Sequence, residues 1–285
     1  MNKYIVIGIV AVALISAFVI GHNFGTVAQT GTTPQTVTPQ NTTQPSPNIH
    51  QNVETAFNPE VKAPQIDNSA FIHPFAVVIG DCEIGKRVFM GPMAVCRGDE
   101  GTPIYIGDDS NVQDGVILHA LETTIDGSNI DGRRFSESGD RLMANDSRFD
   151  QGYAVFIGNR VSLAHGSMIH GPAWIGNDTF IGMKSLVFNA KVGNNVAIGV
   201  SSTITGGVTI PDNSFVPPGS VIDTQQQADS LPSRIGSAYE SINKAVIHVN
   251  QDLAAAYNQG DVQKIRYYKE ILMEEEELIT QQPSP

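Results

Sequence analysis

Residues 66–96 read IDNSAFIHPFAVVIGDCEIGKRVFMGPMAVC. In this stretch an aliphatic or sulfur-containing residue recurs at every sixth position: Ile66, Ile72, Val78, Ile84, Met90 and Cys96. A second series has the same period and runs two residues ahead of members of the first: Ala70, Ala76, Cys82, Val88 and Ala94. The first series resumes at 106–118, 157–187 and 192–222, and glycine often follows its aliphatic residue.

This six-residue period predicts the fold class. Over about 150 residues it excludes a helix, whose period is 3.6, and it is too regular for a β-sandwich. It is typical of an all-β solenoid, the hexapeptide-repeat parallel β-helix, in which three short strands form each coil and aliphatic side chains point inward. We predict this β-helix for residues 53–228, interrupted by an acidic excursion loop at 123–152 and followed at 229–285 by one α-helix or two. An amphipathic helix is predicted over 230–257, because apolar residues recur there at spacings of three and four: Tyr239, Ile242, Val246, Val249 and Leu253. A second candidate helix lies at 262–279.

Composition limits the function classes. The 285 residues include 17 Lys and Arg against 29 Asp and Glu, a net charge of −12. That balance argues against nucleic acid as a partner, since binding to phosphates needs clustered basic side chains. The two cysteines lack C-x-x-C spacing, which excludes a disulfide-dense scaffold and a cysteine-ligated zinc finger. Both fall at inward repeat positions, so we interpret Cys82 and Cys96 as small buried hydrophobic side chains.

The N-terminus has the features of a targeting segment. Lys3 precedes an uncharged apolar run from Tyr4 to Ile20, at the border between a signal-peptide core and a short transmembrane helix. We predict that residues 1–28 are a signal peptide or a membrane anchor, either cleaved or retained. Residues 29–52, rich in Thr, Pro and Gln, are predicted to be a flexible linker. The folded part is then exported, and is extracellular or on the outer face of the cytoplasmic membrane.

Two histidines fall into a common register. When 123–152 is left out, the order of hexads is Leu118, Ile157, Leu163 and Ile169. With three hexads per coil, Ile169 lies on the same face as Leu118, one coil along. His119 and His170 directly follow these residues, so both point outward from strands about 4.8 Å apart. That spacing suits two imidazoles that bind one metal ion.

A third histidine points to a shared site. His165 follows Leu163 by two, near a corner between faces, and need not reach the same ion within one chain. Completion of the pair by a neighbouring subunit favours a cyclic homotrimer with a metal at each junction. Three neutral imidazoles and an open position are typical of catalytic Zn²⁺, and Fe²⁺ or Co²⁺ are alternatives because such sites accept them. The structural alternative is that all three are ordinary surface or interface histidines.

From Phe57 to about Tyr257 the chain resembles the γ-class carbonic anhydrases. The matching motifs are Arg97-Gly98-Asp99-Glu100, Asn111-Val112-Gln113-Asp114-Gly115, Leu118-His119-Ala120-Leu121-Glu122 and the segment from His165 through His170-Gly171-Pro172. The resemblance implies a left-handed β-helix and a homotrimer with metal ligands His119 and His170 from one subunit and His165 from the next. It also implies reversible hydration of CO2 to bicarbonate and a proton by a metal-bound hydroxide.

The resemblance also implies roles for residues around the metal. Gln113 hydrogen-bonds the reacting water and Asn111 orients Gln113. Arg97 and Asp99 bridge subunits beside the metal and help to hold bicarbonate. The acids Glu100 and Glu122 are assigned to proton transfer. The amide side chain of Asn250 contacts substrate.

Two departures and two alternatives accompany this reading. Phe57 stands where the family's best-characterised members have Trp, and His248 stands where they have Tyr; either change affects proton movement or pocket shape.

One alternative to a carbonic anhydrase is a hexapeptide acyltransferase, which uses a single histidine as general base and has no need of three histidines in metal register. The other is a non-catalytic binding or assembly module of the same fold, which turnover measurements would separate from the enzyme.

Overall fold

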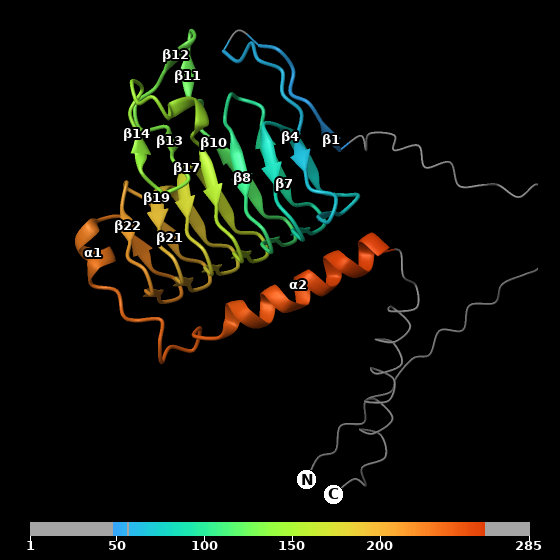
Figure 1. Cartoon of the computed structure of the whole chain (residues 1–285). Coiled ribbons are helices and arrows are strands. Elements are labelled where there is room, and N and C mark those ends of the chain that lie inside the picture. Colours follow the sequence, from blue (N-terminus) through green and yellow to red (C-terminus); the bar gives the residue numbers. More distant parts are fainter. Residues whose placement is uncertain (1–47, 56, 260–285) are drawn as a thin grey trace, which may run out of the picture. The chain divides into compact units, whose positions relative to one another are not determined.

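The computed structural model describes residues 48–55 and 57–259. They form a parallel β-helix with three faces, in which each strand pairs with the equivalent strand one coil along (Figure 1). The predicted all-β solenoid of hexapeptide repeats is thereby confirmed. The predicted targeting segment at 1–28 and a predicted second helix at 262–279 lie outside the described residues. No helix within the described ranges is long and apolar enough to cross a membrane.

Two of the faces join into one 13-stranded sheet, because β17 and β19 each continue around a corner from the first face to the second. The first face consists of β1 (Ile49–His50), β4 (Val77–Gly80), β7 (Val95–Gly98), β10 (Ile117–Ala120), β17 (Met168–Ile175), β19 (Leu186–Val192), β21 (Thr203–Ile204) and β24 (Val221–Ile222). The second face consists of the ends of β17 and β19 together with β2 (Gln65–Ile66), β5 (Cys82–Ile84), β8 (Ile104–Ile106), β15 (Val155–Ile157) and β22 (Thr209–Ile210).

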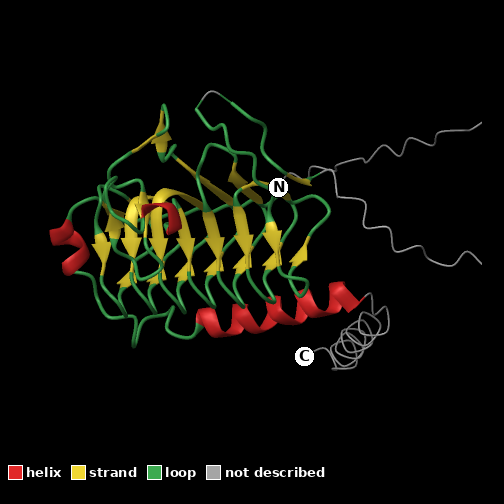
Figure 2. Ribbon diagram, turned by 45° about the horizontal axis from the view of Figure 1, so that its top comes forward, coloured by secondary structure: helices red, strands yellow, loops and turns green. Residues whose placement is uncertain are grey.

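The third face is a separate 7-stranded sheet. Its strands are β3 (Phe71–Ile72), β6 (Phe89–Met90), β9 (Asn111–Val112), β16 (Ser162–Leu163), β18 (Phe180–Ile181), β20 (Ala197–Ile198) and β23 (Phe215–Val216). Every pairing among these three faces is parallel, and Figure 2 shows the strands as successive rungs. The last strand ends at Ile222, where the sequence repeat also ends.

The repeat residues fill the interior. Val78, Leu118 and Ile169 from the first series have no exposed surface, and Ala76 and Val88 from the second are equally buried. They belong to one continuous cluster that runs through the coils. Because burial of an aliphatic side chain contributes about 1.5–3 kcal/mol, the repeat that identifies the fold also supplies most of its stabilisation.

A ladder of Asn and Asp side chains closes the corner between the second and third faces. Asn159 Oδ1 accepts a hydrogen bond from the backbone N–H of Asp108 at 2.8 Å, and Asn177 Oδ1 accepts one from Asn159 at 2.8 Å. Glycine precedes these side chains because the coils approach closely: a Cβ on Gly176 would lie 2.7 Å from the backbone nitrogen of Asn194. Backbone donors at this corner are therefore satisfied from the adjacent coil.

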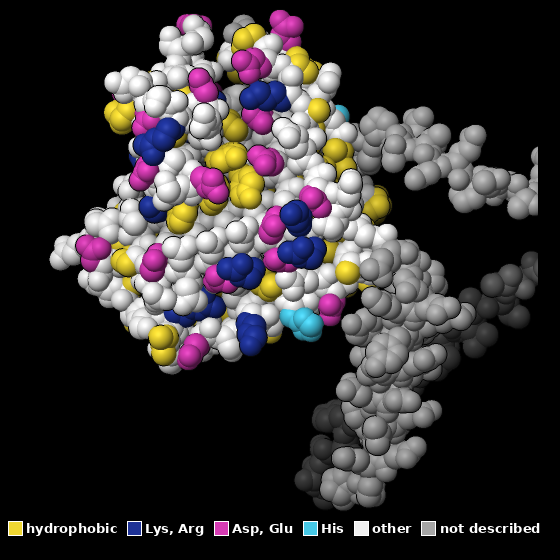
Figure 3. Space-filling model, in the orientation of Figure 1, with side chains coloured by type: hydrophobic (Ala, Val, Ile, Leu, Met, Phe, Trp, Pro, Cys, Tyr) yellow, Lys and Arg dark blue, Asp and Glu magenta, His cyan; other side chains and the backbone are white. Residues whose placement is uncertain are grey.

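Ion pairs also link adjacent coils at this corner. Arg87 pairs with Asp109, and Arg160 with Asp178, each with a shortest N–O distance of 2.6 Å. On the face that Figure 3 presents, basic side chains are interspersed with acidic ones rather than gathered into a patch. Such exposed pairs contribute only about 0–1 kcal/mol each, so the core carries most of the stability.

The chain leaves the β-helix between β10 and β15. This excursion forms two antiparallel hairpins and a 3₁₀ turn: β11 (Thr124–Ile125) with β12 (Ser128–Asn129), β13 (Arg134–Phe135) with β14 (Arg141–Leu142), and η1 (Phe149–Gln151). The excursion docks on aromatic and basic side chains of the second face. Trp174 Nε1 donates to Glu137 O at 3.2 Å, and Lys191 Nζ donates to Gly139 O at 2.8 Å.

Two helices complete the described chain. The short α1 (Gln225–Asp229) begins after the N-cap Thr224, and its buried Ala228 joins the core cluster where the β-helix ends. The longer α2 (Ile242–Gln259) runs back along the third face and contacts β3, β6 and β16 (Figure 2). The Tyr257 ring stacks on Phe71 with centroids 4.7 Å apart.

The folded part begins earlier than predicted. Ile49 pairs with Val78, and His50 with Ile79, so the first strand lies inside the predicted linker at 29–52. Ile49 also packs against the core cluster. A two-residue strand next to a Thr- and Pro-rich stretch is too short to show the six-residue period, which explains the error.

The helical segment also differs from the prediction. Helix α1 lies within the range assigned to the β-helix, and α2 starts at Ile242, whereas an amphipathic helix was expected from residue 230. The expected apolar stripe includes Val249, which is 55% exposed. The buried side of α2 instead carries Asn243, Ile247, Asn250 and Ala254. Because two of these four residues are asparagines, the spacing of hydrophobic residues does not identify this side of the helix as the buried one.

The interpretation of the cysteines is half right. Cys82 and Cys96 are buried as expected, but they are bonded to each other as a disulfide rather than packed as free thiols. Cys82 lies on β5 of the second face and Cys96 on β7 of the first. Both side chains enter the interior from neighbouring faces, and their Cα atoms are 6.6 Å apart, within the reach of a disulfide.

Candidate metal centre

His119 on β10 and His170 on β17 lie opposite each other on the first face. Leu118 pairs with Ile169, which is the register predicted from the hexads, and His119 therefore pairs with His170. His119 Nδ1 and His170 Nε2 are 3.3 Å apart, and the ring centroids are 5.2 Å apart. Because alternate residues of a strand face opposite sides, the inward leucine and isoleucine direct both imidazoles outward.

Hydrogen bonds determine which nitrogens of the pair carry lone pairs. His170 Nδ1 lies 3.1 Å from the carbonyl oxygen of Gly171, so Nδ1 donates and Nε2 carries the lone pair. His119 Nδ1 can then donate to that Nε2, which leaves His119 Nε2 without a proton. Burial lowers the pKa of His119, and the charge of Arg97 lowers it further, so this imidazole is neutral at pH 7. Both rings are thus in the form that ligates a metal.

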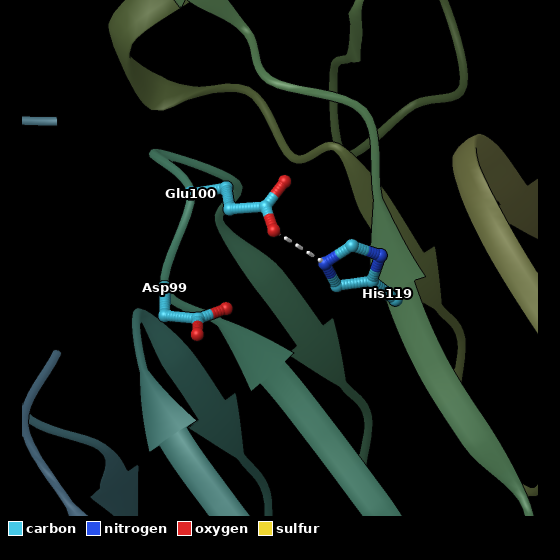
Figure 4. Close-up of side chains that lie close together, drawn as sticks. All are labelled: Asp99, Glu100 and His119. Carbon is cyan, nitrogen blue, oxygen red and sulfur yellow. Dashed lines mark ion pairs between the residues drawn. The ribbon is translucent and has the colours of Figure 1, made fainter. Parts of the chain in front are cut away.

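His119 Nε2 is the atom most in need of a cation. It is buried and has no hydrogen-bond partner. The Glu100 Oε1 atom lies 3.4 Å away, so an imidazole lone pair faces a carboxylate oxygen (Figure 4). Such an arrangement is unfavourable unless a cation or a proton lies between the two atoms.

Arg97, Asp99 and Glu100 form a charged cluster beside the pair. Arg97 lies next to the last residue of β7, just before the loop that carries both acids. Its Nε donates to Asp99 Oδ1 at 3.0 Å and its Nη2 to Glu100 Oε1 at 2.7 Å. Asn58 Nδ2 donates to the Asp99 carbonyl at 3.0 Å and braces the same loop. Donor atoms of Asp99, Glu100 and His119 all lie within 4.8 Å of one another (Figure 4). Because Arg97 already pairs with both acids, the histidine pair is the better cation holder.

Asn111, which begins β9, and Gln113, which directly follows that strand, form a separate hydrogen-bonded chain. Gln113 Nε2 donates to Asn111 Oδ1 at 2.9 Å, and Asn111 Nδ2 donates to Ser162 Oγ at 2.9 Å. All three side chains are buried. The chain fixes the amide orientation of Gln113 and leaves its Oε1 as the remaining acceptor.

The other predicted site residues lie apart from the histidine pair. His165 is exposed, and its Nδ1 is 3.3 Å from Asp114 Oδ2 at the corner between the third and first faces. Asn250 lies on the buried side of α2, where its Nδ2 donates to Val246 O. Glu122 lies just past the end of β10, after Leu121, at the start of the excursion and is half-buried.

The loop that carries Glu100 and the segment that carries Glu122 are joined. Thr123 Oγ1 donates to the carbonyl of Gly101 at 2.6 Å. Arg134, buried in the excursion, donates to the same Thr123 oxygen through Nη2 at 2.8 Å. Glu100 is next to Gly101 and Glu122 is next to Thr123 in the sequence. The Thr123–Gly101 hydrogen bond therefore joins the two segments that carry the acids.

Sequence reasoning missed Ser162, Thr123 and Asn58. The signal for Ser162 was present: it pairs with Asn111 one coil along, and the same counting of hexads that paired the histidines would have found it. Thr123 and Asn58 lie in irregular segments, where no period relates their positions to the repeat.

Comparison with known proteins assigns the class and then the family. Models of a bacterial transferase hexapeptide (six repeats) and of the hexapeptide repeat of succinyl-transferase match residues 63–98 and 189–224. The chain is thus a hexapeptide-repeat protein, here with an outward histidine pair. A carbonic anhydrase of Methanosarcina thermophila is 49% identical over 214 residues, which cover 74% of this chain and 82% of that protein. This chain belongs to the γ-class carbonic anhydrase family.

Two other relatives are less similar to this chain and have different names. Gamma carbonic anhydrase 2, mitochondrial, of Arabidopsis thaliana is 25% identical over 217 residues, which cover 74% of this chain and 67% of that protein. Carboxysome assembly protein CcmM of a Nostoc species is 38% identical over 203 residues, or 71% of this chain. The match covers only 33% of the Nostoc protein, so this chain corresponds to one part of it.

Proposed function

We propose that this protein is a carbonic anhydrase that catalyses the reversible hydration of CO2 to bicarbonate and a proton. One observation carries the proposal: His119 and His170 lie in register on adjacent coils, with His119 Nε2 buried and without a hydrogen-bond partner. A structural histidine would have a partner at this atom. The 49% identity to a named carbonic anhydrase supports the same reaction.

We propose that the pair is completed by His165 of a neighbouring subunit in a homotrimer. The exposure of His165 and its place at a corner support this arrangement, because a ligand offered to another chain must lie on the surface. Zn²⁺ is the metal we expect, with Fe²⁺ and Co²⁺ as alternatives, since three imidazoles suit all of them. When bound, the metal would lower the pKa of a coordinated water toward neutrality, as in known carbonic anhydrases.

The protein side chains would then orient the reactants and carry charge. Gln113 Oε1 accepts a hydrogen bond from the reacting water, because its Nε2 is committed to Asn111. Arg97 supplies positive charge near the oxygens of bicarbonate, and Asp99 holds the Arg97 guanidinium in place. Asn250 is the proposed substrate contact. It would act from the helix that lies along the third face.

The proton released in each turnover must reach solvent. Glu100 is the first candidate acceptor because its carboxylate lies 3.4 Å from His119 Nε2. Glu122 is the second, at the start of the excursion. The Thr123–Gly101 hydrogen bond keeps the two segments together, which would shorten the path between them.

The test is stopped-flow CO2 hydration by the purified full chain, loaded with metal without oxygen. We expect His119→Ala to lower turnover by at least about a thousandfold, because the metal loses a ligand and the reacting water its activation. His50→Ala is the matched control, since His50 is exposed on β1 and its Nδ1 lies 2.8 Å from Gln51 O, away from the histidine pair. Absence of turnover in a metal-replete wild-type protein would contradict the proposal.

The alternatives predict different results. An assembly module, favoured by the similarity to CcmM, would bind metal and show no turnover. A hexapeptide acyltransferase would depend on one histidine and would not need metal. The repeat itself supports that reading, but a single general base does not account for two histidines in register on adjacent coils.

We also propose that the folded part is exported. The Cys82–Cys96 disulfide supports this location, because such bonds persist mainly in oxidising compartments. Residues 1–28 would serve as the signal peptide or anchor, and a protein fused to them in place of its own leader would be found outside the cytoplasm. Retention of that fusion in the cytoplasm would contradict the proposal.

A further inference from the structure

A cavity of about 270 Å³ lies between the excursion and the corner where β17 and β19 run side by side. Its lining combines apolar Leu121, Pro172 and Phe188 with two arginines, Arg133 and Arg141. The strand pairing is irregular here, because Gly171 and Pro172 together oppose the single residue Asn189. Bulges of this kind often re-aim side chains next to functional sites.

The two arginines of the cavity differ in their partners from Arg148 of the same excursion. Within the described ranges neither takes part in an ion pair, in a chain whose net charge is −12. Arg133 Nη1 is buried and has no hydrogen-bond partner. Arg141 uses Nη1 for the Gly132 carbonyl and Asn189 Oδ1, at 3.0 and 2.9 Å, which holds its guanidinium at the cavity. Arg148, by contrast, pairs with two aspartates.

The charge of the cavity is unbalanced. Asp131 is the acid in its lining, and its Oδ1 accepts a hydrogen bond from the Ala144 backbone at 2.7 Å instead of pairing with a guanidinium. Burial also lowers the pKa of Arg141, which shows that its charge is partly removed from water. A desolvated cation with an unused donor beside it favours an anion.

The cavity is next to the histidine pair. The Phe188 ring, part of its lining, contacts the His170 ring with centroids 5.3 Å apart. Phe188 is thus shared between the lining of the cavity and the surroundings of His170.

We propose that this cavity is a second anion site, which binds a small planar oxoanion of the bicarbonate type through the guanidinium groups of Arg133 and Arg141. The fork of N–H donors on a guanidinium matches two oxygens of a planar anion. The apolar side chains around it lower the local dielectric and strengthen the attraction. The choice of bicarbonate as the anion rests on the proposed function, whereas the preference for a planar oxoanion rests on the geometry of the guanidinium groups.

The test measures thermal unfolding of the full chain, metal-loaded, at pH 8 in rising sodium bicarbonate against sodium chloride of equal ionic strength. An anion that binds only the folded state stabilises it by RT ln(1 + [L]/Kd), so Tm starts to rise when the anion concentration approaches Kd. We expect the bicarbonate concentration at which Tm starts to rise to increase about tenfold in Arg133→Gln, because a charge-assisted contact is lost. Arg133→Lys keeps the charge without the fork and should fall between the two. Circular dichroism checks that each variant is folded.

Two controls make the outcomes decisive. Arg148→Gln removes an arginine of the same excursion that is already paired, and it should bind bicarbonate like wild type. His119→Ala disables the metal centre and should also retain the bicarbonate effect. Equal binding by Arg133→Gln and wild type, or loss of the effect in His119→Ala, would overturn the second site. Turnover of the same wild-type sample reports separately on the proposed function.

Discussion

Ser162 illustrates how a buried hydroxyl can act on a reaction without touching the reactants. Its Oγ accepts from Asn111, which in turn accepts from Gln113, so the orientation of the Gln113 amide depends on a residue one coil away. Removal of the hydroxyl would leave the buried Asn111 amide without its acceptor. Ser162 is therefore a positioning residue for Gln113.

We expect Ser162→Ala to lower kcat about tenfold through misorientation of Gln113, while the free energy of unfolding falls by only about 1–3 kcal/mol. Stopped-flow kinetics and denaturant unfolding measure the two effects. Ser185→Ala is the matched control, because Ser185 is equally buried but donates to the Gly199 backbone in another part of the β-helix. It should lose similar stability with unchanged kcat. Equal kcat values for the two variants would refute the positioning role.

The disulfide is a second side-chain feature with a measurable effect. Cys82 and Cys96 are separated by 14 residues, and closure of a loop of about this length stabilises a protein by about 3 kcal/mol through the unfolded chain. We expect dithiothreitol to lower the free energy of unfolding of the wild type by about that amount. The variant with both Cys82→Ala and Cys96→Ala should not respond to dithiothreitol. A wild type that also fails to respond, with its thiols shown to be reduced, would contradict this account.

At the level of secondary-structure elements, α2 is held to the β-helix by polar contacts as well as by its buried side. Gln251 Nε2 donates to Asp109 Oδ1 at 2.8 Å, and Asn243 Nδ2 donates to Arg160 O at 2.9 Å. Arg234, buried before the helix begins, donates to Asn195 Oδ1 at 2.8 Å. Since α2 carries Asn250, these contacts also position a proposed substrate residue.

The Asp109 contact makes this docking sensitive to acid. The hydrogen bond from Arg87, aided by that from Gln251, holds the pKa of Asp109 below its ordinary value of 3.8. A carboxyl with a depressed pKa stabilises the fold fully above pH 3.8, and this contribution is lost as the pH falls through the folded-state value. We therefore expect Asp109→Asn to lower Tm at pH 7, and the difference from wild type to narrow below pH 4.

Thermal unfolding between pH 7 and pH 3 measures that narrowing. The matched control is Asp178→Asn, because the Asp178 carboxylate pairs with Arg160 in the same way but makes no side-chain hydrogen bond to α2 within the described residues. At pH 7 we expect Asp178→Asn to lower Tm less than Asp109→Asn does. A difference between Asp109→Asn and wild type that stays constant across the pH range would contradict the assignment.

For the assembled protein, a metal site shared between subunits predicts that two inactive variants can complement each other. If each metal lies between His119 and His170 of one subunit and His165 of the next, then subunits carrying His119→Ala and subunits carrying His165→Ala can rebuild intact sites together. In a mixed trimer the second kind supplies the pair and the first supplies the third ligand. Each variant alone would form no complete site.

We expect coexpression of these two variants to restore CO2 hydration and bound metal to a fraction of wild type, measured on trimers purified through two different tags. The control is coexpression of His119→Ala with His170→Ala, which should restore nothing because both ligands come from the same subunit. Recovery by this second pair, or failure of the first in a confirmed trimer, would contradict the shared site.

The hexad count alone was sufficient to predict the β-helix, its inward side chains and the pairing of His119 with His170. A period is local information: it specifies which residues share a face, and parallel stacking then places equivalent residues opposite each other. For the same reason the count could have identified Ser162 opposite Asn111. The roles of Arg97, Glu100 and Gln113 came from resemblance to a family rather than from the period.

Features that depend on contacts between non-equivalent positions required the folded structure. The disulfide joins two faces, the Thr123–Gly101 bond joins the excursion to the β-helix, and the unpaired Arg133 and Arg141 meet in a cavity that no period relates. The buried side of α2 was concealed because hydrogen bonding makes asparagine acceptable there. The repeat determines which residues lie opposite each other on adjacent coils of the β-helix. The other contacts form only when segments that are distant in the sequence pack together.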